Sequence, residues 1–318
     1  MPILAANFDE NRLTDGSYAK SLGPDDYFML SPKLDGVRCT IGYTQIWSDK
    51  TGSYERIWSR NGKPIPNKFI RQVLETLPGG LDGEIGPVAI RDKDAYKQAI
   101  HAAMTIEGKP EDWCFFIFNM VPDPDSEDFG LANRLERAKA AVSKWRTEHP
   151  DLAKYARFVE HTRYEAHEHE TILQGAKAFS DAGYEGAMLS CSNAPYLNKR
   201  VSPTKPWLLK LKPFLDAEAT IIGMLPGRYG TNLKTVPEHL WGTAKEEVGA
   251  LLLRDCKGAF KVFKCGSGLN AKQKKEFWAN RQQIIADNTI VTFKYLEVGT
   301  DERPRHPIFL RVRLDANA

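Results

Sequence analysis

Lys33 begins the segment KLDGVR, which spans residues 33–38 and lies between two runs of β-forming residues. A lysine amine attacks the α-phosphorus of a nucleotide only when it is neutral, and the ordinary pKa of a lysine is about 10.4. Neighbouring cations favour the neutral form. Gly36 allows a tight turn, and Arg38 offers a planar fork for phosphate or ribose oxygens. The segment predicts a lysine nucleophile; an ordinary Asp-Gly surface turn is the alternative for this segment alone.

Further acidic and basic residues follow in short segments that suit phosphate chemistry. The segments are SRNG at 59–62, LDGE at 81–84, EGAM at 185–188 and KLK at 210–212. Glu84 and Glu185 offer carboxylate oxygens to a hard divalent cation, whereas Lys210 and Lys212 can neutralise charge on a phosphate in transfer. A single Glu or Lys of this kind is usually a solvated surface charge. The prediction therefore depends on their occurring together.

An aromatic ring and a thioether complete the set of candidate residues. Phe118 belongs to the apolar run FIFN at 116–119, and Met188 ends the EGAM segment. A purine has a flat π-face, so an aromatic ring on one side and a polarizable sulfur on the other would form a suitable clamp. Ordinary core packing is the alternative for either residue considered alone.

The order of these segments resembles that of the covalent nucleotidyltransferases, and most closely the small ATP-dependent DNA ligases of bacteriophages. The resemblance covers nearly the whole chain. It implies that Lys33 carries AMP and that Lys210 and Lys212 assist the transfer. It also assigns the 5′-phosphate of the nick to Arg60, and a metal to Glu84 and Glu185. The nucleotide contacts that it implies are Asp35, Arg38, Glu84, Phe118, Glu185, Met188, Lys210 and Lys212. Asn119 stands where the family usually has Asp.

The last residues of the chain, RPRHPIFLRVRLD at 303–315, resemble the RxPxFxxxR ending of small DNA ligases. In that family the ending orients the pyrophosphate of ATP during self-adenylylation. The resemblance makes Arg305 and Arg313 the candidates for this role. The longer RxDK form is missing because Asp315 is followed by Ala316.

The function implied by the resemblance is sealing of nicks in duplex DNA by an ATP-dependent ligase that passes AMP through a lysine. ATP would be the AMP donor, Mg²⁺ the metal with Mn²⁺ as an alternative, and nicked double-stranded DNA the partner of a monomeric enzyme. An RNA ligase or an mRNA-capping guanylyltransferase is the nearest alternative, since both use the same lysine chemistry. A catalytically silent nucleic-acid-binding protein would not need all of these charged residues.

Composition narrows the class of protein. The formal net charge is only +3, so any surface that grips DNA must be local. Five cysteines without a CxxC pair, and the lack of a signal-like or membrane-spanning run, predict a cytoplasmic protein.

His161, His167 and His169 lie in a polar stretch without cysteine partners, so we expect a solvated helix start there and no zinc site.

The fold predicted to position these residues is α+β. We expect a nucleotidyltransferase (adenylation) domain at 1–213 with mixed and antiparallel sheets and helices, a hinge near Pro213 and Phe214, and an OB-fold β-barrel at 214–318. Strands are predicted at 27–31, 37–43, 81–85, 113–121, 184–190 and 207–211, then at 217–225, 250–255, 259–264, 289–298 and 308–314. Helices are predicted at 67–77, 94–104, 131–148, 170–182 and 271–285. A long loop that could contact DNA is expected at 227–249.

Overall fold

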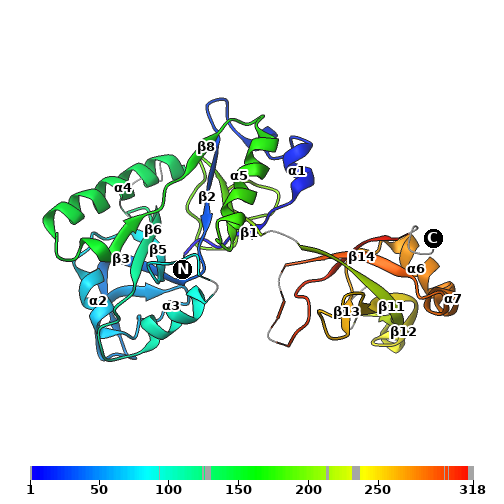
Figure 1. Cartoon of the computed structure of the whole chain (residues 1–318). Helices are drawn as coiled ribbons and strands as arrows, with labels where there is room; N and C mark the ends of the chain where they lie inside the picture. Colours follow the sequence, from blue (N-terminus) through cyan, green and yellow to red (C-terminus); the bar gives the residue numbers. More distant parts are fainter. Residues whose placement is uncertain are drawn as a thin grey trace. The chain divides into compact units, whose positions relative to one another are not determined.

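The computed structural model describes residues 2–92, 94–123, 125, 130–212, 215–230, 237–296, 298–299 and 301–313. The chain divides into two compact units, Met1–Lys212 and Pro213–Ala318 (Figure 1). Pro213 and Phe214, where we predicted a hinge, lie outside the described residues. The predicted α+β class is confirmed, since helices and sheets occur together in the first unit and a third sheet of five strands follows in the second.

Two five-stranded sheets make up the framework of the first unit. In one sheet the strand order is β1 (Ala6–Asn7), β10 (Leu209–Leu211), β9 (Gly186–Cys191), β2 (Phe28–Lys33) and β8 (Thr162–Tyr164). In the other it is β4 (Ser53–Ser59), β3 (Val37–Ser48), β5 (Leu81–Gly86), β6 (Cys114–Met120) and β7 (Ala156–Phe158). The segment 33–38 connects β2 to β3, so it carries the chain from one sheet to the other.

Helices cover these sheets and bury their own apolar faces. Their bounds are α1 Glu10–Thr14, α2 Lys68–Glu75, α3 Ala95–Met104, α4 Gly130–Glu148 and α5 His169–Asp181, with short 3₁₀ turns at Ala19–Ser21 and Ala153–Tyr155. In α2 the buried residues Ile70, Val73 and Leu74 recur at helical spacing, and the Asn67 side chain caps the helix by accepting from Ile70 N. α4 packs on β6, and α5 packs on β9 and β2 (Figure 1).

The second unit is a five-stranded barrel with a helical insertion. The strands are β11 (Leu215–Arg228), β12 (Ala244–Asp255), β13 (Phe263–Cys265), β14 (Ile290–Tyr295) and β15 (Ile308–Val312), ordered β13-β12-β11-β14-β15. A parallel bridge between Ser267 and Ile308, with Phe309 N donating to Ser267 O at 2.9 Å, brings the two edges of this sheet together. Phe263 and Phe293 lie in its core. The predicted OB fold is therefore confirmed.

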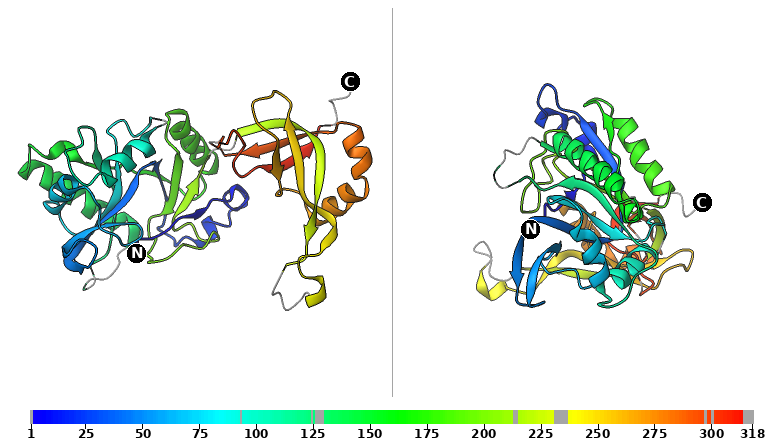
Figure 2. Two further views of the ribbon diagram at one scale, coloured as in Figure 1. Left: turned by 90° about the horizontal axis from the view of Figure 1, so that it is seen from below. Right: turned by 90° about the vertical axis from the view of Figure 1, so that its left-hand side faces the viewer.

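Several predicted elements of the second unit need correction. The single helix expected at 271–285 is two helices, α6 (Ala271–Ala279) and α7 (Arg281–Ala286), separated at Asn280. Both ends of the loop expected at 227–249 are strand, because β11 continues to Arg228 and β12 already begins at Ala244. Residues 231–236 of that loop lie outside the described residues. The paired strands β11 and β12 instead form a long hairpin that extends away from the body of the barrel (Figure 2).

Four strands of the first unit, β1, β4, β7 and β8, were missed. β4 was not predicted, although it pairs with β3 along most of its length. β8 has only three residues, too few for a periodic pattern.

None of the helices that the structure describes has both the length and the apolar character needed to cross a bilayer.

Candidate active site

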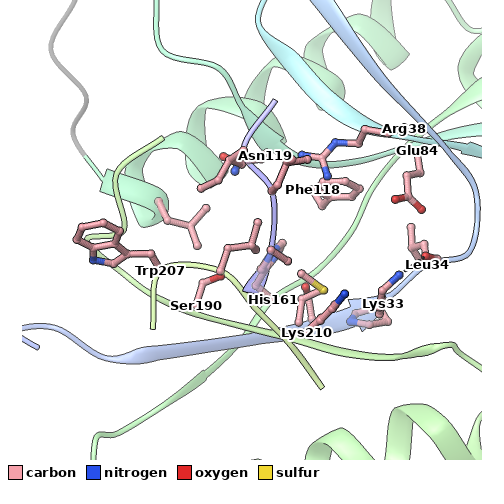
Figure 3. Close-up of a pocket in the computed structure, with 18 of the residues that line it drawn as sticks. Lys33, Leu34, Arg38, Glu84, Phe118, Asn119, His161, Ser190, Trp207 and Lys210 are labelled. Atoms are coloured by element: carbon pink, nitrogen blue, oxygen red, sulfur yellow. Dashed lines mark hydrogen bonds between the residues drawn. The ribbon is translucent and has the colours of Figure 1, made fainter. Parts of the chain in front are cut away.

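A cavity of about 320 Å³ lies in the first unit and gathers the predicted residues (Figure 3). Both sheets contribute to its walls. The predicted site residues that line it are Lys33, Arg38, Arg60, Glu84, Phe118, Glu185, Met188, Lys210 and Lys212. Residues that are far apart in the sequence thus meet in one cavity. No single one of the six sequence segments described above could have shown this. Asp35 does not line the cavity, and Arg305 and Arg313 belong to the second unit.

Lys33 ends strand β2 and forms an ion pair with Glu185. Strand pairing explains this contact, because Lys33 lies opposite Gly186 on β9 and Glu185 directly precedes that residue. Lys212 pairs with the same carboxylate, so Glu185 lies between two ammonium groups. Although burial opposes ionisation, these two cations hold the pKa of Glu185 below its ordinary value. Glu185 is therefore charged at neutral pH.

Lys210 brings a further positive charge to the same wall. It lies on β10 directly opposite Met188 of β9. Burial, followed by repulsion from Lys212 and Arg200, lowers the pKa of Lys210 below its ordinary value. Like charges held this close favour a ligand that brings negative charge between them, such as a phosphate.

Glu84 lies on β5 in the opposite sheet and has a different charge state. Burial raises its pKa to about 7, although Lys33 and Arg38 act in the other direction. Its Oε2 accepts a hydrogen bond from Gly36 N at 3.2 Å, which ties β5 to the segment that follows the lysine. Glu84 therefore gains or loses a proton near neutral pH, and an arriving cation would favour the charged form.

Arg38 is held in place by a buried carboxylate that we had not predicted as part of the site. Its Nε and Nη2 donate to the two oxygens of Asp82 at 2.6 and 2.7 Å, and Asp82 is completely buried. Tyr196 donates its hydroxyl to Asp82 at 2.8 Å. The guanidinium lies 4.6 Å from the centre of the Phe118 ring. The fork expected to bind phosphate thus binds Asp82, and Arg38 supports the aromatic wall of the cavity.

Glycines in the motifs allow the backbone to pack closely where charged residues must meet. Gly186, beside Glu185, has φ +145°, and a Cβ there would lie 2.1 Å from Leu211 O. At Gly83, beside Glu84, a Cβ would lie 2.2 Å from Phe116 O. Any larger residue would push β9 away from β10, or β5 away from β6. The DGE and EGxM patterns therefore set the spacing of the walls as well as the chemistry.

Asn119, which departs from the family pattern, is largely buried and lines the cavity. Its Oδ1 accepts from the Arg134 Nε at 3.1 Å and from Met120 N at 2.9 Å. Arg134 also donates to Ala194 O at 2.9 Å. A neutral amide is thus enough to orient this buried arginine, and it supplies no charge for a metal.

Sequence reasoning missed several residues of the cavity. They include Asp82, which holds Arg38 from outside it, and the lining residues Ser31, Arg134, His161, Arg200 and Trp207. The prediction that His161 belongs to a solvated helix start is wrong, because His161 precedes β8 and its side chain lines the cavity. Arg200 carried a weak signal, since it is basic and ten residues before Lys210. His161 carried none, because its position depends on how two sheets meet.

The arginines of the last segment lie on the second unit. Arg313 forms an ion pair with Glu218 of β11 while its backbone N donates to Ile290 O at 2.8 Å. Arg305 is exposed, and its carbonyl accepts from Leu296 N at 3.1 Å. Asp315 lies outside the described residues.

Comparisons with known proteins agree with this architecture. The family model for the DNA ligase OB-like domain matches residues 241–313. The Chlorella virus DNA ligase-adenylate structure is 26% identical, with a TM-score of 0.50, over 99% of this chain and 98% of that one. A Lig E DNA ligase shares the fold at 20% identity and a TM-score of 0.58, over 98% of this chain and 99% of that one. Pmar-Lig shares the fold at 22% identity and a TM-score of 0.63, over 98% of this chain and 67% of the longer one. None of the curated proteins matches the sequence.

Proposed function

We propose that this chain, whose resemblance to small ATP-dependent DNA ligases is confirmed over nearly its whole length, seals nicks in duplex DNA through a lysyl–AMP intermediate. The observation that carries the proposal is the meeting of Lys33, Glu185, Lys210 and Lys212 in one cavity with Glu84 opposite. In this proposal the first unit is the adenylation domain, and the enzyme acts as a monomer.

The first step is attack of the Lys33 Nζ on the α-phosphorus of ATP. A nitrogen–phosphorus bond forms, the bond from the α-phosphorus to the bridging oxygen breaks, and pyrophosphate leaves. The attacking amine must be neutral, so the ion pair of Lys33 with Glu185 must open and the ammonium must lose a proton to solvent as the nucleotide enters. Lys210 and Lys212 would then offset the charge that develops on the phosphate oxygens.

Adenine would lie in the part of the cavity between Phe118 and Met188. Phe118 offers a ring backed by the Arg38 guanidinium, and Met188 lines the wall formed by β9. This places the base beyond the charged end of the cavity, so that the α-phosphate can reach Lys33.

The two later steps move AMP onto DNA and off again. An oxygen of the 5′-phosphate at the nick attacks the lysyl–AMP phosphorus and releases the Lys33 amine, giving a DNA–adenylate. The 3′-hydroxyl then attacks the 5′-phosphate, so the phosphodiester forms and AMP leaves. Arg60 is exposed at the end of β4 and also lines the cavity, which suits a contact with the 5′-phosphate.

Mg²⁺, or Mn²⁺ in its place, would be held by Glu84 and Glu185. Their carboxylate oxygens suit a hard divalent ion. The described residues contain no group of three or more His, Cys, Asp or Glu side chains fit to hold a metal, so phosphate oxygens and water would complete the shell. When bound, the ion offsets negative charge on the phosphates.

Intact-protein mass spectrometry tests the first step directly. Incubation with ATP and Mg²⁺ should add one AMP to the chain, and peptide mapping should place it on Lys33. A guanylyltransferase would instead be labelled by GTP alone. Sealing of nicked DNA compared with nicked RNA then separates a DNA ligase from an RNA ligase, and sealing of RNA alone would contradict the proposal.

A further inference from the structure

His161 lies where the two sheets of the first unit meet. It follows β7 of one sheet and precedes β8 of the other, and Val159 N donates to Ile117 O of β6 at 2.7 Å. The β2–β8 register pairs Leu30 with Thr162, so the next position sets His161 opposite Ser31, two residues before Lys33. Its side chain lines the cavity between the walls that carry Phe118 and Lys210 (Figure 3).

The hydrogen bonding of the His161 ring fixes where its proton is. Nδ1 lies 2.9 Å from the carbonyl oxygen of Val159, and a carbonyl can only accept, so Nδ1 carries the hydrogen. Burial lowers the pKa of His161 to about 4, although the Val159 carbonyl and Glu160 act in the other direction. The ring is therefore neutral at pH 7, and Nε2 presents a lone pair.

Nε2 is open to a ligand. The described residues offer the His161 ring no hydrogen bond other than the one to Val159. Among the described residues, some side-chain nitrogens are both fully buried and without a hydrogen-bond partner, for example Trp113 Nε1. The Nε2 of His161 is not one of these atoms, so it is not sealed off from solvent. An acceptor that lines a cavity and lacks a partner is a natural contact for an incoming N–H group.

Other polar side chains near this part of the cavity do not offer the same selectivity. The Ser31 and Ser190 hydroxyls can donate or accept, because each can rotate its hydrogen. Arg134 can only donate. The Asn119 Oδ1 already accepts from Arg134 and from Met120 N. His161 differs because its hydrogen-bonding sense is set by the backbone.

We propose that His161 selects the base: its Nε2 accepts a hydrogen bond from the 6-amino group of adenine and disfavours guanine, whose 6-oxo group is also an acceptor. Adenine presents an N–H donor at this position of the ring, and guanine presents an oxygen. With guanine, the lone pair of Nε2 would face a lone pair of the 6-oxo oxygen. No hydrogen bond could form between them, and both acceptors would remain unpaired. The inference rests on the proposed function, because it assumes that the purine of ATP enters this cavity.

The test compares three nucleotides in the self-labelling reaction: ATP, GTP, and purine riboside triphosphate, which lacks the 6-amino group. With the wild-type protein, kcat/KM should be about tenfold higher for ATP than for the purine analogue. In His161→Leu this ratio should fall to about one, and discrimination against GTP should weaken by about tenfold. His161→Gln keeps an acceptor oxygen and should retain part of the preference for ATP.

Controls separate base selection from damage to the fold. His167→Leu makes the same replacement at an exposed residue of the same segment and should leave all three ratios unchanged. A purely structural role of His161 would lower activity with every nucleotide equally, and an unchanged ratio of ATP to the purine analogue in His161→Leu would overturn the inference. If the wild-type protein accepts no nucleotide at all, the proposed function itself fails and the inference with it. A wild-type protein labelled equally by ATP and GTP would leave the proposed lysine chemistry intact and contradict base selection alone.

Discussion

The two units of this chain hold their predicted functional residues in different ways. In the first unit, Lys33, Glu185 and Arg38 are each fixed by an ion pair within or beside the cavity. In the second unit, Arg305 is exposed, and Arg313 pairs with Glu218 at a partly exposed position on the barrel. The charges in the first unit are thus partly enclosed by the walls of the cavity, whereas the two arginines of the second unit lie at more exposed positions, where solvent screens their charge.

This difference indicates a division of labour. A cavity with organised charges can orient a nucleotide by itself, since its groups need little rearrangement when the ligand arrives. Arginines on the surface of a barrel can assist only when a ligand or another surface is brought to them. We therefore expect substitutions in the cavity to affect both stability and chemistry, and those in the second unit to affect chemistry alone.

The largest effect is expected for Lys33→Ala. Without the nucleophile no nitrogen–phosphorus bond can form, so both AMP labelling and sealing of a nick should be lost. Mass spectrometry and a gel-based sealing assay measure the two. Lys177→Ala, which replaces an exposed lysine of α5, is the matched control and should remain active. Labelling of the Lys33→Ala protein at the wild-type rate would show that another residue is the nucleophile.

The buried pair beneath the cavity should dominate stability. Asp82→Asn keeps the shape of the side chain but leaves the Arg38 guanidinium without a charged partner, and we expect a loss of about 3 kcal/mol in the free energy of unfolding. Urea unfolding followed by fluorescence measures it. Asp181→Asn breaks the exposed pair with Lys177 and should cost less than about 0.5 kcal/mol. Equal losses in the two variants would contradict a special role for the buried pair.

Glu84 should make the stability of the nucleotide-free protein depend on pH. Its pKa of about 7 in the folded chain exceeds the ordinary value of 4.5, so the folded state binds more protons between these values. Stability should therefore be highest below about pH 4.5 as far as this group is concerned, and should fall as pH rises to about 7.

The variant Glu84→Gln removes this titration. It should flatten the decline in stability between about pH 4.5 and 7, and be more stable than the wild type at pH 8 by roughly 2 kcal/mol. Thermal unfolding at a series of pH values is the measurement. Glu107→Gln, at an exposed position, should keep the wild-type slope. A wild-type slope in Glu84→Gln would assign the pH dependence to other groups.

The smallest effect is expected in the second unit. Arg313→Ala should slow the reaction with ATP by about tenfold, since one charge near the pyrophosphate would be lost. Sealing of a nick that already carries AMP should be unaffected, and the free energy of unfolding should change by less than about 1 kcal/mol. Arg303→Ala, which breaks an exposed pair with Asp301, is the control. Equal slowing of both reactions would show that Arg313 contributes to more than the ATP step.

Periodicity and short motifs were enough to predict most of the framework. The four helices predicted before residue 213 all occur, and α2 shows the signals most clearly, since its buried residues recur at helical spacing and Asn67 caps its start. Local patterns failed where structure depends on partners. Strand β8 is only three residues long and exists because β2 lies beside it, and the break at Asn280 divides a helix that looked continuous.

By itself the sequence determined the types of chemical group, their order along the chain, and the α+β architecture followed by an OB fold. The reason is that hydrophobic period and turn residues are local properties, and motif residues keep fixed spacing within a segment. Only the tertiary structure decided that Lys33 meets Glu185, that Arg38 is held by Asp82, and that His161 enters the cavity. The first two contacts join residues 152 and 44 positions apart, and His161 lies where the two sheets meet in the folded chain. All three therefore depend on strand register rather than on any one segment.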